Sequence, residues 1–228
     1  MIGVVLGTLL AVLGLMGGEA VLGQPASEWG PHRWVQGGPL SLAGLRGRVV
    51  LVRFFMSAEC PYCRGTAPSL NELHRQLGRA GLVVVGFFTP KPKPRPTSVE
   101  EVRGHVEAYG FRFPVAVDDD WSALRALWLD RVPDASFTSS SLLIDKRGIV
   151  RNVHPGGIFA KDGPDPRARR DYEALRAAIE RLLAGVSPRD GATFLAAVAL
   201  AVLMTVVGSL LPALRAVRLD PLSAIRVE

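Results

Sequence analysis

Apolar and polar positions follow two periods along the middle of the chain. Short apolar runs predict strands at residues 49–55, 82–88 and 113–117, and the stretch 140–153 predicts a hairpin around a glycine-containing turn. Helical spacing predicts a helix that contains Leu70, Leu73 and Leu77, one from the Ser98/Glu101 capping box to about Tyr109, and two more at 118–129 and 170–183. Strands that alternate with helices predict an α/β domain in which helices flank a mixed sheet.

Two further runs carry no charge at all, at residues 2–18 and 192–214. A helix needs about 20 apolar residues to cross a bilayer, so we expect membrane helices at 1–23 and 191–214. A signal peptide and a buried helix are the alternatives for the first run.

Charges beside the second run predict an orientation. Arg215, Arg218 and Arg226 follow it, and positive residues next to a span tend to stay in the cytoplasm. We therefore expect a basic cytoplasmic tail at 215–228 and a middle domain, 34–186, that faces the periplasm from the inner membrane after a linker at 24–33.

Composition excludes several classes of protein. The chain has 228 residues, 48% hydrophobic and 21% charged, which excludes a disordered tail. Its two cysteines exclude a disulfide-stapled miniprotein and a four-cysteine zinc site. The net charge of +6 comes mostly from scattered arginines without interleaved aromatic residues, so we expect no nucleic-acid partner.

The sequence Cys60-Pro-Tyr-Cys63 follows a predicted strand and opens a predicted helix. Free N–H groups and the positive dipole end of a helix start favour a thiolate at Cys60, and Cys63 lies one turn later, near enough to form a disulfide. Pro61 suits the first helical turn. Inert thiols and half of a zinc site are the alternatives; no two of the four histidines have ligand spacing. We expect neither a metal nor a cofactor.

A family resemblance covers residues 34–185. The segments 47–55, 60–68, 113–118, 142–151 and 154–157 occur in the order typical of thioredoxin-fold redoxins. The chain thus resembles membrane-anchored thiol–disulfide oxidoreductases and the alkyl hydroperoxide reductase/thiol-specific antioxidant group. The resemblance implies a thioredoxin-like sheet and a protein or small-molecule thiol or disulfide as substrate. It also implies that Cys60 attacks and Cys63 resolves the mixed disulfide.

Two positions depart from the family pattern. Glu59 replaces the usual aromatic residue before the first cysteine, and Ser139 occupies the usual cis-proline position that faces the cysteines. Tyr62 is expected to shape the partner surface. A carboxylate at Glu59 should raise the pKa of Cys60. We expect the N–H groups and dipole of the helix start to lower it by more, to a pKa of roughly 6.5–8.

Residues 185–228 resemble the end of an FtsX-like ABC-transporter permease, including the Asp-Pro in the basic tail. This implies a permease or ATPase partner, in addition to an expected membrane redox donor. Two alternatives to the oxidoreductase remain. One is a permease-derived membrane component with an incidental redoxin domain. The other is a thiol peroxidase, in which Ser57 would stand at the usual threonine position.

Overall fold

The computed structural model describes residues 19–132, 135, 138–185, 198–206 and 208. The chain divides into two compact units, Met1–Gly185 and Val186–Glu228, and residues 198–206 of the second are helical. None of the described helices is both long and apolar enough to cross a membrane. Most of the expected membrane helices, 1–23 and 191–214, and all of the tail 215–228 lie outside the described residues.

The first unit contains one mixed sheet of six strands in the order β1-β4-β3-β2-β5-β6. Strands β2, β3 and β4 are parallel, whereas β1, β5 and β6 join antiparallel. The predicted mixed sheet and the predicted hairpin, β5–β6, are therefore confirmed. The strands are β1 Arg33–Gln36, β2 Val49–Phe55, β3 Leu82–Phe88, β4 Val115–Val117, β5 Ser141–Ile144 and β6 Val150–His154.

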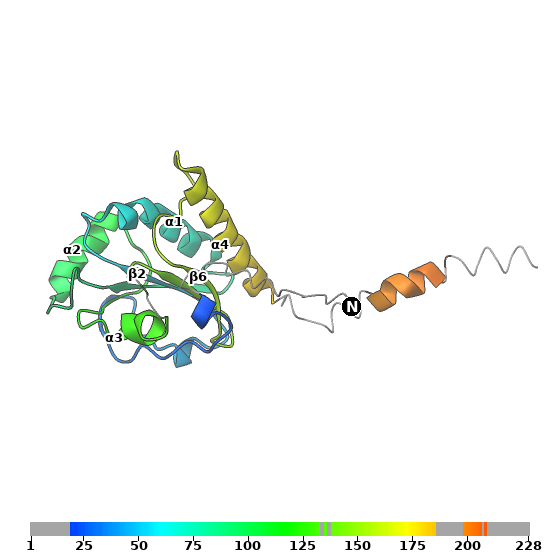
Figure 1. Ribbon diagram of the computed structural model, residues 1–228, viewed down its shortest axis with the longest axis horizontal. Coiled ribbons are helices and arrows are strands. Elements are labelled where there is room, and N and C mark those ends of the chain that lie inside the picture. The colour runs from blue at the N-terminus through cyan, green and yellow to red at the C-terminus, as the bar shows by residue number, and fades with distance from the viewer. Residues whose placement is uncertain (1–18, 133–134, 136–137, 186–197, 207, 209–228) are drawn as a thin grey trace, which may run out of the picture. The chain divides into compact units, whose positions relative to one another are not determined.

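Helices cover both faces of this sheet (Figure 1). Helices α1, α2 and α4 lie on one side, and α3 lies on the other beside the N-terminal segment. The helices are α1 Pro61–Leu77, α2 Val99–Tyr109, α3 Ser122–Leu124, which continues as a π-helical turn Arg125–Leu129, and α4 Pro166–Ala184, with short 3-10 turns at Glu19–Val21 and Ala43–Leu45.

Strand β2 is buried along its whole length. Its side chains alternate between two cores: Leu51 and Phe55 pack on the α1 side, and Val52 and Phe54 pack on the α3 side. A parallel strand covered on both faces needs apolar residues at nearly every position. This burial explains why every residue of β2 except Arg53 is apolar.

The segment before β1 packs against the sheet instead of acting as a linker. Val21 and Trp29 are buried, and the Trp29 indole N–H donates to the Leu40 carbonyl at 2.9 Å. The Gly23 N–H donates to the Val150 carbonyl at 2.8 Å. The expected linker 24–33, together with residues 19–23, thus contributes to the α3-side core, because Trp29 meets Phe87 edge-on at 5.4 Å.

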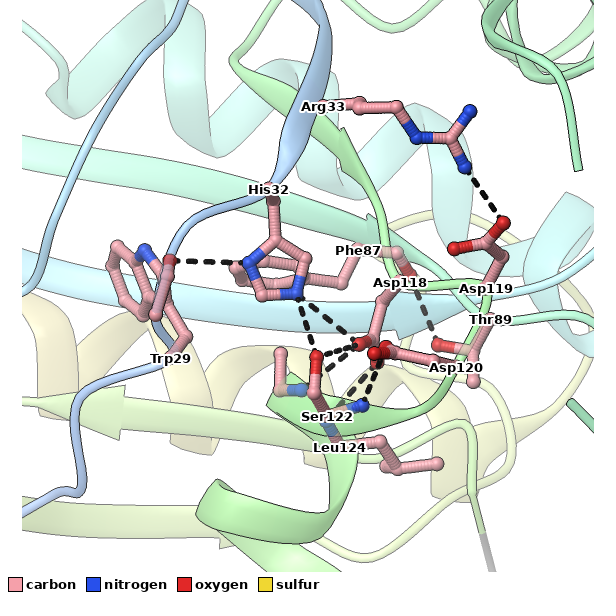
Figure 2. A network of polar contacts seen from close by, with 12 residues as sticks. Trp29, His32, Arg33, Phe87, Thr89, Asp118, Asp119, Asp120, Ser122 and Leu124 are labelled. Carbon is pink, nitrogen blue, oxygen red and sulfur yellow. Dashed lines mark hydrogen bonds and ion pairs between the residues drawn. The ribbon is translucent and has the colours of Figure 1, made fainter. Parts of the chain in front are cut away.

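A buried carboxylate fixes the start of α3 (Figure 2). Asp118 accepts hydrogen bonds from the backbone N–H groups of Ala123 and Leu124 at 2.8 and 3.0 Å, and His32 Nε2 lies 3.2 Å from it. The helix expected from residue 118 therefore begins only at Ser122; Trp121 is its N-cap residue, and the Asp118 side chain accepts from two N–H groups of its first turn.

The His32–Asp118 contact predicts a pH-dependent stability. Burial alone would lower the pKa of His32, but the hydrogen bond to Asp118, the Gly30 carbonyl and the nearby carboxylates outweigh it and raise that pKa above 6.5. The stabilisation should therefore be complete below about pH 6.5 and should disappear as the pH rises through the raised value.

We expect the wild-type protein to have a larger free energy of unfolding than His32→Gln at low pH. The difference between the two proteins should be larger at about pH 5.5 than at about pH 8.5, by on the order of 1 kcal/mol. Urea unfolding of both proteins at both pH values measures this difference. An equal gap at the two pH values, or a larger gap at high pH, would show that protonated His32 is not favoured by the fold.

Candidate active site

The two cysteines lie where β2 leads into α1. Cys60 is the N-cap of α1, and Pro61 occupies the first turn. The Cys60 sulfur accepts a hydrogen bond from the Cys63 backbone N–H at 3.3 Å. Both residues are free thiols, with 7% of Cys60 and 2% of Cys63 exposed. The helix start therefore brings the pair together and leaves Cys60 as the more accessible thiol.

Helix α2 and the first turn of α1 hold the segment between β2 and Cys60. The Tyr109 hydroxyl donates to the Ser57 carbonyl at 2.5 Å, and the Ala58 N–H donates to His105 Nδ1 at 3.2 Å. The Arg64 guanidinium donates to the Ala58 carbonyl at 2.7 Å. With these backbone groups occupied, the position of Cys60 is fixed from both sides.

The electrostatics of Cys60 differ from the sequence expectation. Burial raises the pKa of the Cys60 thiol, and a hydrogen bond with the Cys63 side chain raises it further. The backbone N–H groups of Tyr62 and Cys63 lower that pKa but do not outweigh burial. The expected net lowering was therefore wrong, because it assumed that Cys60 is exposed at the helix start.

A groove of about 510 Å³ lies beside the motif. Tyr62, with 57% of its surface exposed, lines it together with Ser139, so two of the expected site-shaping residues share one surface. The remaining lining residues are Met56, Lys91, Pro92, Trp121, Thr138, Gly156 and Gly157. Glu59 is exposed and is not among them; a hydrogen bond with the Ser57 side chain lowers its pKa.

Lys91 places a cation at this groove. Its ammonium lies 5.1 Å from the centre of the Trp121 ring, and the Trp121 N–H donates to the Pro90 carbonyl at 2.9 Å. Burial lowers the pKa of Lys91 to about 8, although the cysteine pair opposes this shift. Nothing in the sequence pattern marked Lys91 as a site residue, so its position at this groove was missed.

Arg53, a buried residue of β2, was missed as well. It is 1% exposed. Arg53 on β2 lies opposite Ser141 on β5, and Ser141 lies opposite His154 on β6. The Arg53 guanidinium donates to the Ser141 hydroxyl at 3.1 Å. Burial lowers the pKa of Arg53, and the cysteine pair opposes this shift. A single arginine inside the apolar run 49–55 was the signal that could have identified it.

One group of residues resembles a metal site in composition. His32, Asp118 and Asp120 offer ligand atoms within 4.8 Å of one another. Two backbone N–H groups already occupy the Asp118 carboxylate, and Asp120 accepts from the Ser122 N–H at 2.9 Å. The arrangement is accounted for by the start of α3, and it does not involve the cysteines.

Residues 23–153 match the AhpC/TSA family. The chain belongs to this family. The match includes the cysteine motif, the whole sheet up to β6 and the N-terminal segment that packs against it. It ends well before residues 185–228, so it gives the permease resemblance no support.

Individual relatives of this AhpC/TSA chain have different names. A candidate peroxiredoxin of Mycobacterium tuberculosis is 34% identical over 40% of this chain and 53% of its own length. The thiol-disulfide oxidoreductase ResA of Bacillus anthracis is 27% identical over 51% of this chain and 60% of its own. The chain thus spans little more than half the length of the curated relatives that it matches.

A solved structure shows the same fold. A candidate thiol:disulfide interchange protein DsbE of Chlorobium tepidum superposes with a TM-score of 0.52 at 22% identity, over 70% of this chain and 98% of the other. The predicted thioredoxin-like fold of this AhpC/TSA domain is therefore confirmed.

The geometry predicts how the two thiols react. Cys60 should be alkylated before Cys63 because it is the more exposed, but at about pH 7 it should react at least about tenfold more slowly than in the urea-unfolded chain, because burial disfavours its thiolate. Mass spectrometry of reduced protein after timed alkylation resolves both sites. Faster reaction of folded Cys60 than of the unfolded chain would contradict the raised pKa.

Proposed function

We propose that this protein is a thiol–disulfide oxidoreductase in which Cys60 and Cys63 cycle between dithiol and disulfide. The observation that carries the proposal is the sulfur of Cys60 at the N-cap of α1, 3.3 Å from the backbone nitrogen of Cys63. The pair lies at the end of a rigid central strand and beside a groove.

The exchange follows from the geometry. A substrate thiolate attacks the accessible Cys60 sulfur of the disulfide, the bond to Cys63 breaks, and Cys63 leaves with the electron pair. A second substrate thiolate then displaces Cys60 from the mixed disulfide. The substrate loses two electrons as its disulfide forms, and the Cys60–Cys63 pair gains them. The reverse sequence reduces a substrate disulfide.

The groove supplies a surface for a protein or small-molecule thiol or disulfide. Tyr62 and Trp121 offer apolar area, Ser139 offers a hydroxyl, and Lys91 offers a cation. Aromatic side chains next to a few polar groups are typical of ligand sites.

A peroxidase is the second function to consider, because a candidate peroxiredoxin is among the relatives. Ser57 stands three residues before Cys60, but its side chain hydrogen-bonds with Glu59 and its carbonyl accepts from the Cys60 N–H at 3.0 Å. With this hydroxyl turned to Glu59, the arrangement favours disulfide exchange over peroxide reduction.

An exchange assay tests the activity. The assay follows exchange of the full chain with a disulfide-bonded peptide and, separately, with the same peptide in its reduced form. Cys60→Ser should lower both rates at least about 100-fold, because the attacking sulfur is lost. Cys63→Ser should trap the substrate on Cys60 as a mixed disulfide. Hydrogen peroxide consumption in parallel is the control: a protein that consumes peroxide rapidly but exchanges no disulfides would be a peroxidase.

We also propose that the apolar segments 1–23 and 191–214 tether the domain to the inner membrane, with the domain in the periplasm. Two features of the sequence support this proposal. Residues 2–18 and residues 192–214 carry no charge, and arginines follow Leu214. An oxidising compartment suits a cysteine pair of this kind. A membrane redox donor and a permease or ATPase partner have only the sequence to support them.

Reporter fusions test this topology. A reporter active only in the periplasm should give no signal after Glu228 and a strong signal when inserted at the exposed Gly163. A cytoplasmic reporter at the same two positions is the control and should give the opposite pattern. If Gly163 reports as cytoplasmic, the orientation is wrong.

A further inference from the structure

Lys91 is the one charged side chain among the described residues that line the groove beside the cysteine motif. The other described lining residues are apolar, aromatic or hydroxyl-bearing side chains and two glycines. Lys91 is half-buried, and no carboxylate of the described part of the chain lies within ion-pair distance of its ammonium. The groove therefore offers a positive charge and no negative group of its own to balance it.

Trp121 fixes the position of this cation. The Lys91 ammonium lies 5.1 Å from the centre of the Trp121 ring, and the indole N–H is held by the Pro90 carbonyl at 2.9 Å. The face of an indole attracts a cation but carries no net charge. The ammonium has three N–H donors, each of which a carboxylate oxygen can accept. Trp121 thus positions the charge without neutralising it.

The backbone of Trp121 shows that its place is enforced. Trp121 is the only non-glycine residue of the described chain with a positive φ, at 65°. A bulky residue rarely adopts this left-handed conformation, and the strain persists where the surrounding structure imposes it, often at functional sites. The Trp121 N–H donates to the Asp118 carbonyl at 3.2 Å, and the Asp118 carboxylate holds the turn that follows (Figure 2). The network at the start of α3 therefore also fixes the ring beneath Lys91.

The same groove begins at the cysteine motif. Tyr62 is the second residue after Cys60 and the residue directly before Cys63, and it lines the groove with 57% of its surface exposed. Consecutive Cα atoms are about 3.8 Å apart, so this wall lies within two residues of either cysteine. A substrate joined to Cys60 as a mixed disulfide has its neighbouring groups within reach of the groove.

We propose that Lys91 is a specificity-determining residue that selects substrates with a carboxylate close to the reactive sulfur, such as a cysteine next to an aspartate or glutamate. The inference rests on the proposed oxidoreductase function and names its substrate class. A substrate carboxylate supplies the anion that the groove lacks, whereas a basic substrate would place a second positive charge beside Lys91. Disulfide exchange should therefore be faster with acidic substrates than with neutral or basic ones.

The first test compares three peptides on the wild-type full chain. The peptides have blocked ends and one cysteine followed by aspartate, asparagine or lysine, and each is offered to the reduced protein as its disulfide. Each rate is divided by the rate of the same peptide with free dithiothreitol, which removes its intrinsic reactivity. At about pH 7 and low salt, we expect the aspartate peptide to react about fivefold faster than the asparagine peptide, and the lysine peptide about fivefold more slowly.

Screening by salt shows whether this preference is electrostatic. At about 1 M salt the Debye length falls to about 3 Å, so the three corrected rates should converge to within about twofold. Equal corrected rates at low salt, or a preference for the lysine peptide, would overturn the inference.

Substitutions assign the preference to Lys91. The readout is the ratio of the aspartate rate to the asparagine rate on one protein, in which any change in the reactivity of Cys60 cancels. Lys91→Met should bring this ratio to within about twofold of one, Lys91→Arg should keep it, and Lys91→Glu should invert it. Lys93→Met is the matched control, because Lys93 is an exposed lysine of the same loop that does not line the groove. A ratio that survives in Lys91→Met would overturn the role of Lys91.

A second pair of substrates identifies the source of the carboxylate. The disulfides of thioglycolate and of mercaptoethanol differ in a carboxylate and a hydroxyl and contain no peptide. A Lys91-dependent excess for the thioglycolate disulfide supports recognition of a carboxylate on any small thiol. An excess confined to the aspartate peptide supports recognition of an acidic peptide segment. No excess in either pair contradicts the proposal.

The outcomes separate this inference from the proposed function. A wild-type protein that exchanges with none of the peptides removes the oxidoreductase itself. A protein that exchanges with all three at equal corrected rates keeps the oxidoreductase and removes the selection by Lys91. If Lys91→Met and Lys91→Glu do not fold, the wild-type ratio at low and high salt and the ratio in Lys91→Arg decide: a salt-sensitive excess present in both proteins supports the inference, and its absence overturns it.

Discussion

The burial of β2 on both faces is the constraint on which the rest of the structure depends. The strand pairs with β3 over seven residues and with β5 over four, so its end cannot shift without breaking two ladders. The dithiol lies directly beyond that end, at the first turn of α1. Hydrogen bonds from Tyr109 and Arg64 then hold the short connection. A rigid strand–helix junction fixes the backbone of both cysteines more firmly than a loop would.

Burial also decides the charge of the dithiol. A helix start offers N–H donors and a favourable dipole, and by itself it would favour a thiolate at Cys60. Here the same junction is packed so closely that Cys60 loses most of its contact with water, and desolvation outweighs the donors. The motif alone therefore does not determine reactivity, since the outcome depends on how much of the sulfur the neighbouring segments cover.

Local signals in the sequence were sufficient for the fold and for the position of the cysteine pair. The apolar run at 49–55, the Ser98 cap, which accepts from the Glu101 N–H at 3.0 Å, and the turn before Gly148 all act within a few residues, and the structure agrees with each. The packing of residues 19–33, the groove cation Lys91 and the buried Arg53 depend on contacts between segments far apart in the chain. Arg53 shares a row with Ser141 and His154 only because three strands meet in register, and no local pattern contains that information.

The identity of the buried cation matters as much as its position. Burial among apolar groups lowers the pKa of a lysine, as it does at half-buried Lys91, where the pKa falls to about 8. Arginine stays protonated even where burial lowers its pKa, so its charge persists while the pair is a neutral disulfide. An arginine at this position therefore keeps its charge in both redox states of the pair, whereas a lysine would titrate in response to its surroundings.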